Sequence, residues 1–511
     1  MRQGNSEYEK RLPVNAGTYD VTISRPADNI YNKFEYTYMA VITVDKAVRT
    51  IGEVKLEAED VGYTFLKLKL IGDGEIDDLS SEAKFTYEAK NSGSVIGRSA
   101  DRDSYIYDIL PNKTYDITVK VTDDPNYLDA ESEVGAQVST LSAPKDSWVD
   151  KGNYDTGWYD NNKSSAYFTI NSAKQLAGLS YLVNNGVTFE NKTITLTADV
   201  DLRGHMWLPI GYNDNCWFRG TFDGGNHKIT GLYYSNSGAW NPGLFGKVKN
   251  SNRIEIKNIL LDHSYIYGYS RVGGIVGYAQ DAVTINNCVN YARIYSNDSR
   301  VGGILGMSAS SATNVMNCVN YGYIRGYNEE TGGIVGYVDT GTVMNCANYG
   351  KVYGYNDVGG IVGQNATKNA KAYNNFNVGT VTGTHYYIGA VVGRNEEDRG
   401  QVHQVYYLRY SANCNGDVRK AVGGEKSYVE DDRSKGGGIK AAYFTSPTSA
   451  LSRRCEDDTN INQGLLPALN HWAARCSDSG AVQWESTGRG GYPLPKGSPV
   501  PEAMDTRTLI R

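Results

Sequence analysis

Tyrosine and cationic side chains recur at a regular interval in the middle of this 511-residue chain. They stand on either side of one apolar residue in each copy of a repeated segment. The positions are Tyr265, Tyr267, Arg293, Tyr295, Tyr323, Arg325, Lys351 and Tyr353. Because side chains alternate along a β-strand, these residues are expected together on one solvent-facing surface. Tyrosine offers a flat apolar ring and a polar tip, so the surface could bind a sugar or a protein. The alternative is cross-strand stacking that only stiffens the sheet.

Carboxylates that could support glycoside cleavage precede the repeats. Asp199, Asp201 and Asp223 are the candidates, because such enzymes need acids that converge on one face. Asp223 stands in a Phe-Asp-Gly-Gly turn, where Asp is expected for backbone reasons. No Gly-x-Ser-x-Gly motif or phosphate loop is present in the sequence. We therefore assign no catalytic residue, no metal ligand and no cofactor.

Acidic turns and cysteines give two further candidates for metal or redox chemistry. The turns Asn297-Asp-Ser, Asn328-Glu-Glu and Asn356-Asp could collect calcium, but ordinary turn chemistry is the favoured interpretation. Three cysteines share one repeat position and are interpreted as small buried side chains: Cys288, Cys318 and Cys346. The pairing of the other four stays open: Cys216, Cys414, Cys455 and Cys476.

A glycine-rich block sets the repeat that must position these side chains. Gly-Gly-Ile-Val-Gly or a close variant begins at 273, 302, 332, 359 and 389, in steps of 29, 30, 27 and 30 residues. Such a period predicts stacked coils, and we interpret each repeat as one turn of a three-sided coil with three short strands. One inward column is expected at Ile266, Ile294, Ile324 and Val352. A column of stacked asparagines in left-handed conformation is expected at a corner: Asn290, Asn320, Asn348 and Asn377.

The remaining chain divides into regions of different pattern. We expect a partial β-module over 1–48, a β-sandwich over 49–144, the β-helix over 145–410 and its C-terminal cap over 411–511. Ser172 with Gln175 predicts the start of an amphipathic helix that covers the first coil. A short helix is expected over 464–475, and a last strand at Trp484 and Gly491–Pro493 is expected at the other end.

Several motifs resemble known families. Trp207-Leu-Pro-Ile-Gly211, the segment Phe218–Leu232 and the glycine blocks resemble the GLUG-repeat family. This resemblance implies an all-β fold with a right-handed parallel β-helix, on a secreted or surface-anchored bacterial protein. Asn15–Val21 resembles MBG-like modules, and Leu110–Tyr115 resembles the tyrosine corner of fibronectin type III domains. Some immunoglobulin A metalloproteases carry the same β-helix, but their His-Glu-x-x-His motif is missing from this sequence. Peptidase activity is therefore not implied.

Charge and hydropathy limit the classes of partner expected for this chain. The net charge of −6 gives no basic footprint for nucleic acid, and no apolar run is long enough to span a membrane. We expect a monomeric, extracellular or cell-surface protein whose export signal lies outside this chain. Its expected function is non-enzymatic, as an adhesin or a module that contacts a host glycan, a protein or another surface component. A carbohydrate-active β-helix enzyme and a passive spacer are the alternatives.

Overall fold

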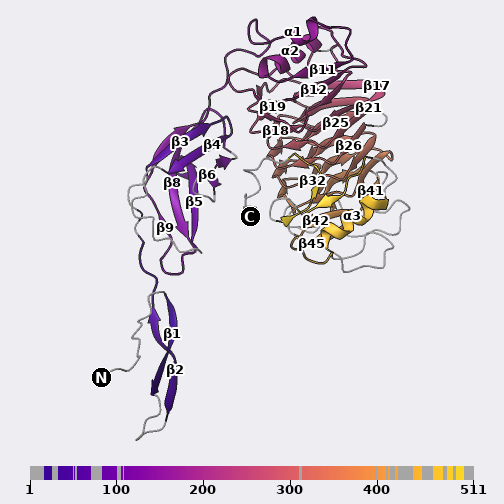
Figure 1. The fold of residues 1–511 in the computed structure, drawn as a ribbon. Helices are drawn as coiled ribbons and strands as arrows, with labels where there is room; N and C mark the ends of the chain where they lie inside the picture. Colours follow the sequence, from indigo (N-terminus) through magenta and orange to yellow (C-terminus); the bar gives the residue numbers. More distant parts are fainter. Residues whose placement is uncertain are drawn as a thin grey trace. The chain divides into compact units, whose positions relative to one another are not determined.

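The computed structural model describes most of the chain. The described residues are 16–25, 33–49, 51, 55–70, 83–99, 105–107, 109–213, 215–309, 313–396, 401–409, 412–414, 421–423, 441–451, 464–475, 480–486 and 491–499. They form two compact units (Figure 1): one comprises residues 1–61 and 65–141, and the other comprises residues 62–64 and 142–511.

The first unit is built from antiparallel strands. β1 (Gly17–Arg25) pairs with β2 (Phe34–Val44). A three-stranded sheet contains β3 (Leu56–Val61), β4 (Phe65–Leu70) and β7 (Tyr105–Tyr107). A five-stranded sheet contains β5 (Lys84–Asn91), β6 (Ser94–Ser99), β8 (Thr114–Thr122), β9 (Ala130–Glu131) and β10 (Ala136–Ser139). Leu66 and Leu68 of one sheet share a buried core with Tyr87 and Ile117 of the other, as in a β-sandwich.

Tyr115 makes the contact that the sequence motif predicts. Its Oη accepts a hydrogen bond from the backbone N–H of Leu110 at 2.8 Å. A phenol that bonds back to the backbone a few residues upstream defines a tyrosine corner. The corner is present, whereas membership of the fibronectin type III or MBG-like classes stays a prediction.

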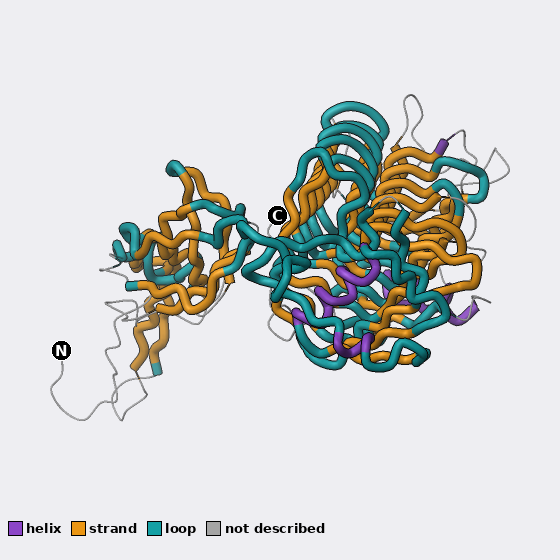
Figure 2. Tube along the Cα trace, turned by 90° about the horizontal axis from the view of Figure 1, so that it is seen from above, coloured by secondary structure: helices purple, strands orange, loops and turns teal. Residues whose placement is uncertain are grey.

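The second unit is a parallel β-helix, whose coils are stacked on one another (Figure 2). Strands of successive coils pair to form four parallel sheets along it. Sheet 1 contains β11 (Tyr167–Ile170), β12 (Thr193–Leu196), β14 (Thr221–Asp223), β17 (Phe245–Lys257), β21 (Val276–Asn286), β25 (Leu305–Ala309), β26 (Thr313–Met316), β30 (Val335–Val338), β31 (Gly341–Met344), β35 (Val362–Asn365), β36 (Ala370–Tyr373), β40 (Val392–Asn395), β41 (Gln401–His403) and β44 (Val422–Gly423). Sheet 2 contains β13 (Val200–Asp201), β15 (Lys228–Thr230), β18 (Leu260–Asp262), β22 (Val289–Asn290), β27 (Val319–Asn320), β32 (Ala347–Asn348), β37 (Phe376–Asn377), β42 (Val405–Leu408) and β45 (Ala441–Phe444).

The other two sheets are smaller. Sheet 3 contains β16 (Tyr233–Ser235), β19 (Tyr265–Gly268), β23 (Arg293–Ser296), β28 (Ile324–Gly326), β33 (Val352–Gly354), β38 (Val381–Gly383) and β43 (Ala412–Cys414). Sheet 4 contains β20 (Val272–Gly273), β24 (Val301–Gly302), β29 (Thr331–Gly332), β34 (Val358–Gly359) and β39 (Ile388–Gly389). From β18 to β41 the chain visits sheets 2, 3, 4 and 1 in each turn, so the expectation of three strands per repeat is wrong.

The glycine block explains the extra corner. Gly273 ends β20 and Val276 begins β21, so the block is divided between two sheets. A Cβ on Gly273 would lie 2.0 Å from the Val276 carbonyl oxygen, and one on Gly274 would lie 2.3 Å from the Gly303 carbonyl oxygen. Only glycine fits a bend this tight.

Two asparagine ladders run through the turns. In the inner one, the amides of Asn290, Asn320, Asn348 and Asn377 bond in sequence at 2.7–2.8 Å and are fully buried. The stacked amides are thus where the sequence placed them, but their backbone is not left-handed. The left-handed residues belong to the other ladder: Asn258, Asn287, Asn317, Asn345 and Asn374. In each Asn-Cys-Val/Ala-Asn motif, the first asparagine and not the second adopts the left-handed conformation.

The N-terminal end of the β-helix is covered by helices. α1 (Gly157–Asp160) and α2 (Ala173–Asn184) lie beside β11 and β12 at the first coil (Figure 1). Ser172 Oγ accepts a hydrogen bond from Gln175 N at 3.4 Å, and Gln175 Oε1 accepts one from Asn171 N at 2.9 Å. Leu176 and Leu179 are buried in the core, so the predicted capping helix is confirmed.

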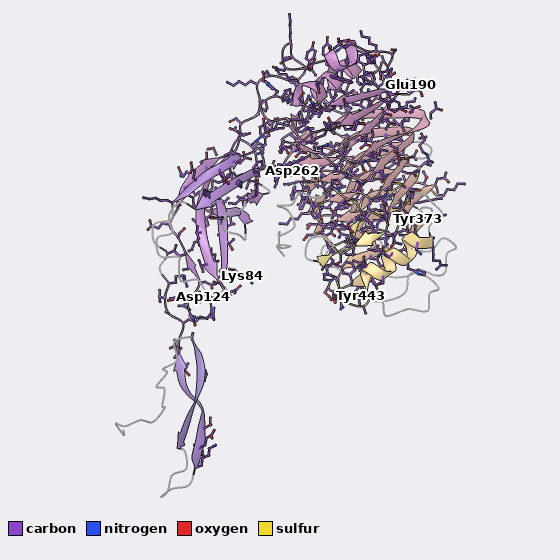
Figure 3. All side chains as sticks on the ribbon, in the orientation of Figure 1. Lys84, Asp124, Glu190, Asp262, Tyr373 and Tyr443 are labelled. Atoms are coloured by element: carbon purple, nitrogen blue, oxygen red, sulfur yellow. The ribbon has the colours of Figure 1, made fainter. Side chains whose placement is uncertain are left out.

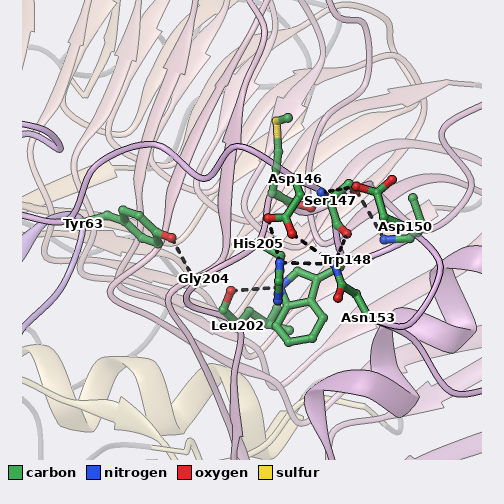
Figure 4. A network of polar contacts seen from close by, with 11 residues as sticks. Tyr63, Asp146, Ser147, Trp148, Asp150, Asn153, Leu202, Gly204 and His205 are labelled. Carbon is green, nitrogen blue, oxygen red and sulfur yellow. Dashed lines mark hydrogen bonds and ion pairs between the residues drawn. The ribbon is translucent and has the colours of Figure 1, made fainter.

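The segment that leads into α1 is fixed by a polar network (Figure 4). His205 Nδ1 lies 2.8 Å from Asp146 Oδ1, and this hydrogen bond lowers the pKa of the Asp146 carboxyl. The Trp148 ring packs on His205, and its Nε1 donates to the Leu202 carbonyl at 2.9 Å. The network ties residues 146–148 to the first turns.

The C-terminal segments lie along the side of the β-helix. α3 (Leu465–Arg475), β46 (Trp484–Glu485) and β47 (Leu494–Pro495) pack on the outer face of sheet 2. Trp484 Nε1 donates to Asn345 Oδ1 at 2.6 Å. The ring centroids of Tyr373 in β36 and Trp472 in α3 are 6.4 Å apart, and Figure 3 shows Tyr373 near α3. The helix was predicted correctly. The strand expected at the far end is instead a short antiparallel pair against the side.

Candidate functional site

The predicted tyrosine and cation positions share the outer face of sheet 3. We call this set the tyrosine face: Tyr265, Tyr267, Arg293, Tyr295, Tyr323, Arg325, Lys351 and Tyr353. Tyr265 pairs with Arg293, Tyr267 with Tyr295, and Arg325 with Tyr353 across neighbouring strands. The residues between them are the inward column of Ile266, Ile294, Ile324 and Val352, which are buried as predicted.

The centre of the tyrosine face is closed rather than open to solvent. Arg293 and Tyr295 are only 8% and 7% exposed. The Arg293 guanidinium carbon lies 4.6 Å from the Tyr323 ring centroid, and its Nη2 and Nε donate to Tyr295 Oη at 2.5 and 3.0 Å. The expectation that these two side chains face solvent is therefore wrong. Strands stack ~4.8 Å apart, so each large side chain covers the next one.

The periphery of the face remains reachable. Tyr265, Tyr267, Tyr323 and Tyr353 are half-buried, and Lys351 is exposed. The Tyr295 ring lies 5.5 Å from the Tyr265 ring and 5.8 Å from the Tyr323 ring. Edge-to-face and tilted ring pairs at such distances stabilise one another. The result is a rigid aromatic surface that loses little side-chain entropy when it binds a partner.

Burial keeps the phenols of this face neutral. It raises the pKa of Tyr265 and Tyr323 above the ordinary value of tyrosine. A neutral phenol can both donate and accept a hydrogen bond. The tyrosine face therefore presents apolar rings, hydroxyl groups and fixed cations, which suits polyhydroxylated or mixed-polarity ligands.

Two exposed tyrosines extend the face beyond the predicted residues. Tyr327 is 50% exposed and Tyr355 is 41% exposed, and each directly follows the glycine that ends its strand. The Arg325 guanidinium carbon lies between two rings, 4.5 Å from the Tyr327 centroid and 4.9 Å from the Tyr353 centroid. We call Tyr327 and Tyr355 the rim. The sequence signal for them is the Gly-Tyr pair that recurs at 326–327 and 354–355.

The acidic turns bind partners within the chain. Asn328 Nδ2 donates to Asp298 Oδ1 at 3.0 Å, and Arg300 Nε donates to Glu330 Oε2 at 2.9 Å. Among the described residues, no group of three or more His, Cys, Asp or Glu side chains is arranged to hold a metal ion. These contacts join the turns of neighbouring coils to one another.

The three acids considered for catalysis are each held by nearby groups. Asp199 Oδ1 accepts from Lys228 N at 2.9 Å, and Asp201 Oδ2 accepts from Arg203 Nη2 at 2.6 Å. Asp223 Oδ1 accepts from Gly225 N at 2.9 Å, as its turn motif predicted. Asp199 and Asp201 flank sheet 2, whereas Asp223 ends a strand of sheet 1.

The cysteines divide into a core column and scattered residues. Cys288, Cys318 and Cys346 are fully buried free thiols, and burial raises the pKa of Cys288 and Cys346. Cys216 is also free and is half-buried. The side chain of Cys414 and all of Cys455 and Cys476 lie outside the described residues, so their pairing stays open.

Comparisons with known proteins place the chain only coarsely. No family model matches it. A stretch of 139 residues, 26% of this chain, is 30% identical to halomucin from Haloquadratum walsbyi, so the match spans only 2% of that relative. A protein from Bacteroides ovatus described as a candidate immunoglobulin A1 protease is 21% identical, with 64% of this chain and 92% of that chain covered and a TM-score of 0.47. An exopolygalacturonase from Yersinia enterocolitica is 10% identical over 73% of this chain and 87% of that chain, with a TM-score of 0.19.

The described helices are short. None of them has the length and apolar character that a membrane-spanning helix requires.

Proposed function

We propose that this chain is a non-enzymatic, extracellular or cell-surface binding module, and that its tyrosine face and rim contact a glycan. The observation that carries the proposal is the Arg293 stack, in which the guanidinium bonds to Tyr295 Oη and lies over the Tyr323 ring. These contacts hold a row of aromatic rings rigid across successive turns. Half-exposed rings around this stack and the exposed rim supply flat surfaces on which sugar rings can lie. A protein ligand is the competing occupant.

A glycan array with matched variants tests this proposal. Tyr295 is a poor probe because it is buried, so the test variant is Tyr327→Ala with Tyr355→Ala. The control is Tyr167→Ala, an exposed tyrosine (78%) in β11. The double variant should lose most binding while the control keeps it. Equal binding by all three proteins would refute the tyrosine face, and binding to proteins but to no glycan would assign it to a protein ligand.

The enzyme alternative requires a separate assay. Incubation with polysaccharides should yield no shorter products if the chain only binds. Cleavage that Asp199→Asn or Asp223→Asn abolishes would replace the binding proposal with a carbohydrate-active enzyme. A passive spacer would bind nothing on the array.

The division into four regions is also a proposal. The GLUG-like motifs support a surface location, and the pattern change near Ser142-Ala-Pro-Lys supports a linker before the β-helix. Limited proteolysis should cut near this linker and leave a resistant fragment that contains residues 146–409. Resistance at the linker with early cuts inside the repeats would contradict the division. A monomer is expected by light scattering.

A further inference from the structure

A second aromatic and cationic surface lies in the early turns, where the chain passes from sheet 3 through sheet 4 into sheet 1. It is formed by residues that flank the first glycine blocks on either side. We call it the block-edge patch: Trp217, Trp240, Lys247, Lys249, Arg271 and Tyr278. None of these residues was singled out by the sequence.

Arg271 is the centre of this patch. Its backbone is left-handed, with φ of 55°, and its guanidinium carbon lies 5.1 Å from the Trp240 centroid and 4.9 Å from the Tyr278 centroid. Within the described part of the chain, no carboxylate forms an ion pair with Arg271, and its buried Nε has no hydrogen-bond partner. Burial and the neighbouring Arg300 lower the pKa of Arg271. The cation is thus held where its charge is uncompensated.

The aromatic rings continue to Trp217. Tyr278 lies 5.7 Å from Trp217, and the Trp217 ring has Lys247 Nζ at 5.4 Å and Lys249 Nζ at 5.6 Å. Asp281 approaches Lys249 at 3.9 Å. The patch therefore combines ring faces with an excess of positive charge.

The arginine at the same position in the next turn has an ion-pair partner. Arg300, one turn below Arg271, bonds to Glu330 at 2.9 Å. Arg394 of β40 stands at the register position of Tyr278, and its guanidinium lies 3.9 Å from Asp357 and 3.6 Å from Glu396. Arg300, which takes the place of Arg271 in the next turn, has a carboxylate of the chain itself, whereas among the described residues Arg271 has none within ion-pair distance. The contrast indicates that the carboxylate for Arg271 comes from outside.

We propose that the block-edge patch binds an acidic saccharide, with a sugar carboxylate on Arg271 and the apolar ring face on Trp240. Trp240 is 45% exposed, so a sugar ring can lie on it. The planar guanidinium fork matches a carboxylate. Lys249 would attract further negative charge along the polymer, whereas Lys247 is buried and its Nζ donates to the Asn213 carbonyl at 2.6 Å.

Sedimentation or calorimetry with alginate, a polyuronate, tests the proposal, and uncharged dextran is the reference ligand. The wild-type protein should bind alginate and not dextran. Arg271→Gln should weaken alginate binding about tenfold or more, as expected for loss of a charged hydrogen-bonded pair. Arg253→Gln, an exposed arginine of β17, should leave it unchanged.

Further variants exclude trivial explanations. Trp240→Ala should also weaken binding, and Arg271→Lys should restore only part of it because lysine lacks the fork. Circular dichroism checks that each variant folds. No alginate binding by the wild type, equal binding to dextran, or equal loss in Arg253→Gln would overturn the proposal. It does not depend on the tyrosine face, because Tyr327→Ala with Tyr355→Ala should leave alginate binding intact.

Discussion

Replacement of Asn320 by alanine should cut the inner asparagine ladder at its middle. Asn320 is fully buried and makes four hydrogen bonds: Nδ2 donates to Asn348 Oδ1 at 2.8 Å and to Gly322 O at 3.2 Å, and Oδ1 accepts from Asn290 Nδ2 at 2.8 Å and from Gly322 N at 3.1 Å. Its truncation would remove a partner from two donors and two acceptors in the core. Gly322 N would still donate to Asn290 O and Asn348 Oδ1 would still accept from Gly350 N, whereas Asn290 Nδ2 and Gly322 O would lose their bonds to Asn320.

The cost follows from those orphaned groups. An unpaired buried polar group costs about 1–3 kcal/mol, and a relaxed neighbour or a trapped water recovers part of it. We therefore expect Asn320→Ala to lower the free energy of unfolding by about 3–5 kcal/mol, a large part of the ~5–15 kcal/mol typical of a domain. In a stacked repeat the loss should concentrate in adjacent turns.

Urea unfolding followed by circular dichroism gives the size of the loss, and hydrogen exchange gives its place. Faster exchange should appear in β27, β28 and β32 before the rest of the β-helix. Asn328→Ala is the control, since Asn328 is exposed and bonds to Asp298 outside the core. A loss below about 1 kcal/mol, or one equal to the control, would refute the ladder as a stabilising element.

Three further outcomes are expected. Burial raises the pKa of Asp357 to about 7 from 3.8, so the folded protein keeps a proton that the unfolded chain releases. The free energy of unfolding should therefore fall as pH rises between these values, by at most about 4 kcal/mol. Urea titrations at several pH values measure this slope, and Asp357→Asn should remove it. Trp484→Ala removes the indole bonded to Asn345 and should expose residues 464–499 to protease, with about 3–5 kcal/mol lost from that segment; unchanged digestion would contradict the packing. Maleimide should label Cys216 in the native protein but Cys318 only after denaturation, and early Cys318 labelling would contradict its burial.

The repeat itself predicted most of the β-helix. Its period set the stacking, and the alternation around Ile266 and Ile294 set which side chains face the core. The corner inside the glycine block was missed because Gly-Gly-Ile-Val-Gly also suits a continuous strand. Residue type could not decide which asparagine of the motif is left-handed either, since Asn287 and Asn290 tolerate that conformation equally.

The candidate site was predicted in its position but not in its exposure. Strand alternation put Tyr295 on the outer face, yet its burial depends on the rings stacked above and below it. The repeat pattern also did not predict that α3, β46 and β47 cover the outer face of sheet 2. Trp484 comes after the period has ended, and nothing in the repeat indicates which face the returning chain covers.

The corner column shows how a repeat of nearly constant core can carry varied chemistry. Down this column the left-handed residue is Asn241, Arg271, Arg300, Glu330 and then Asp357. Inward positions pair with their own copies above and below, so a change there breaks contacts in two neighbouring turns. The corner positions differ from these: the buried carboxylates of Glu330 and Asp357 each lie near an arginine, Arg300 at 2.9 Å and Arg394 at 3.9 Å. Charge can therefore turn from positive to negative along the column without loss of the fold. An acidic polymer should then prefer the early turns, because Arg300 in the next turn already lies beside the carboxylate of Glu330.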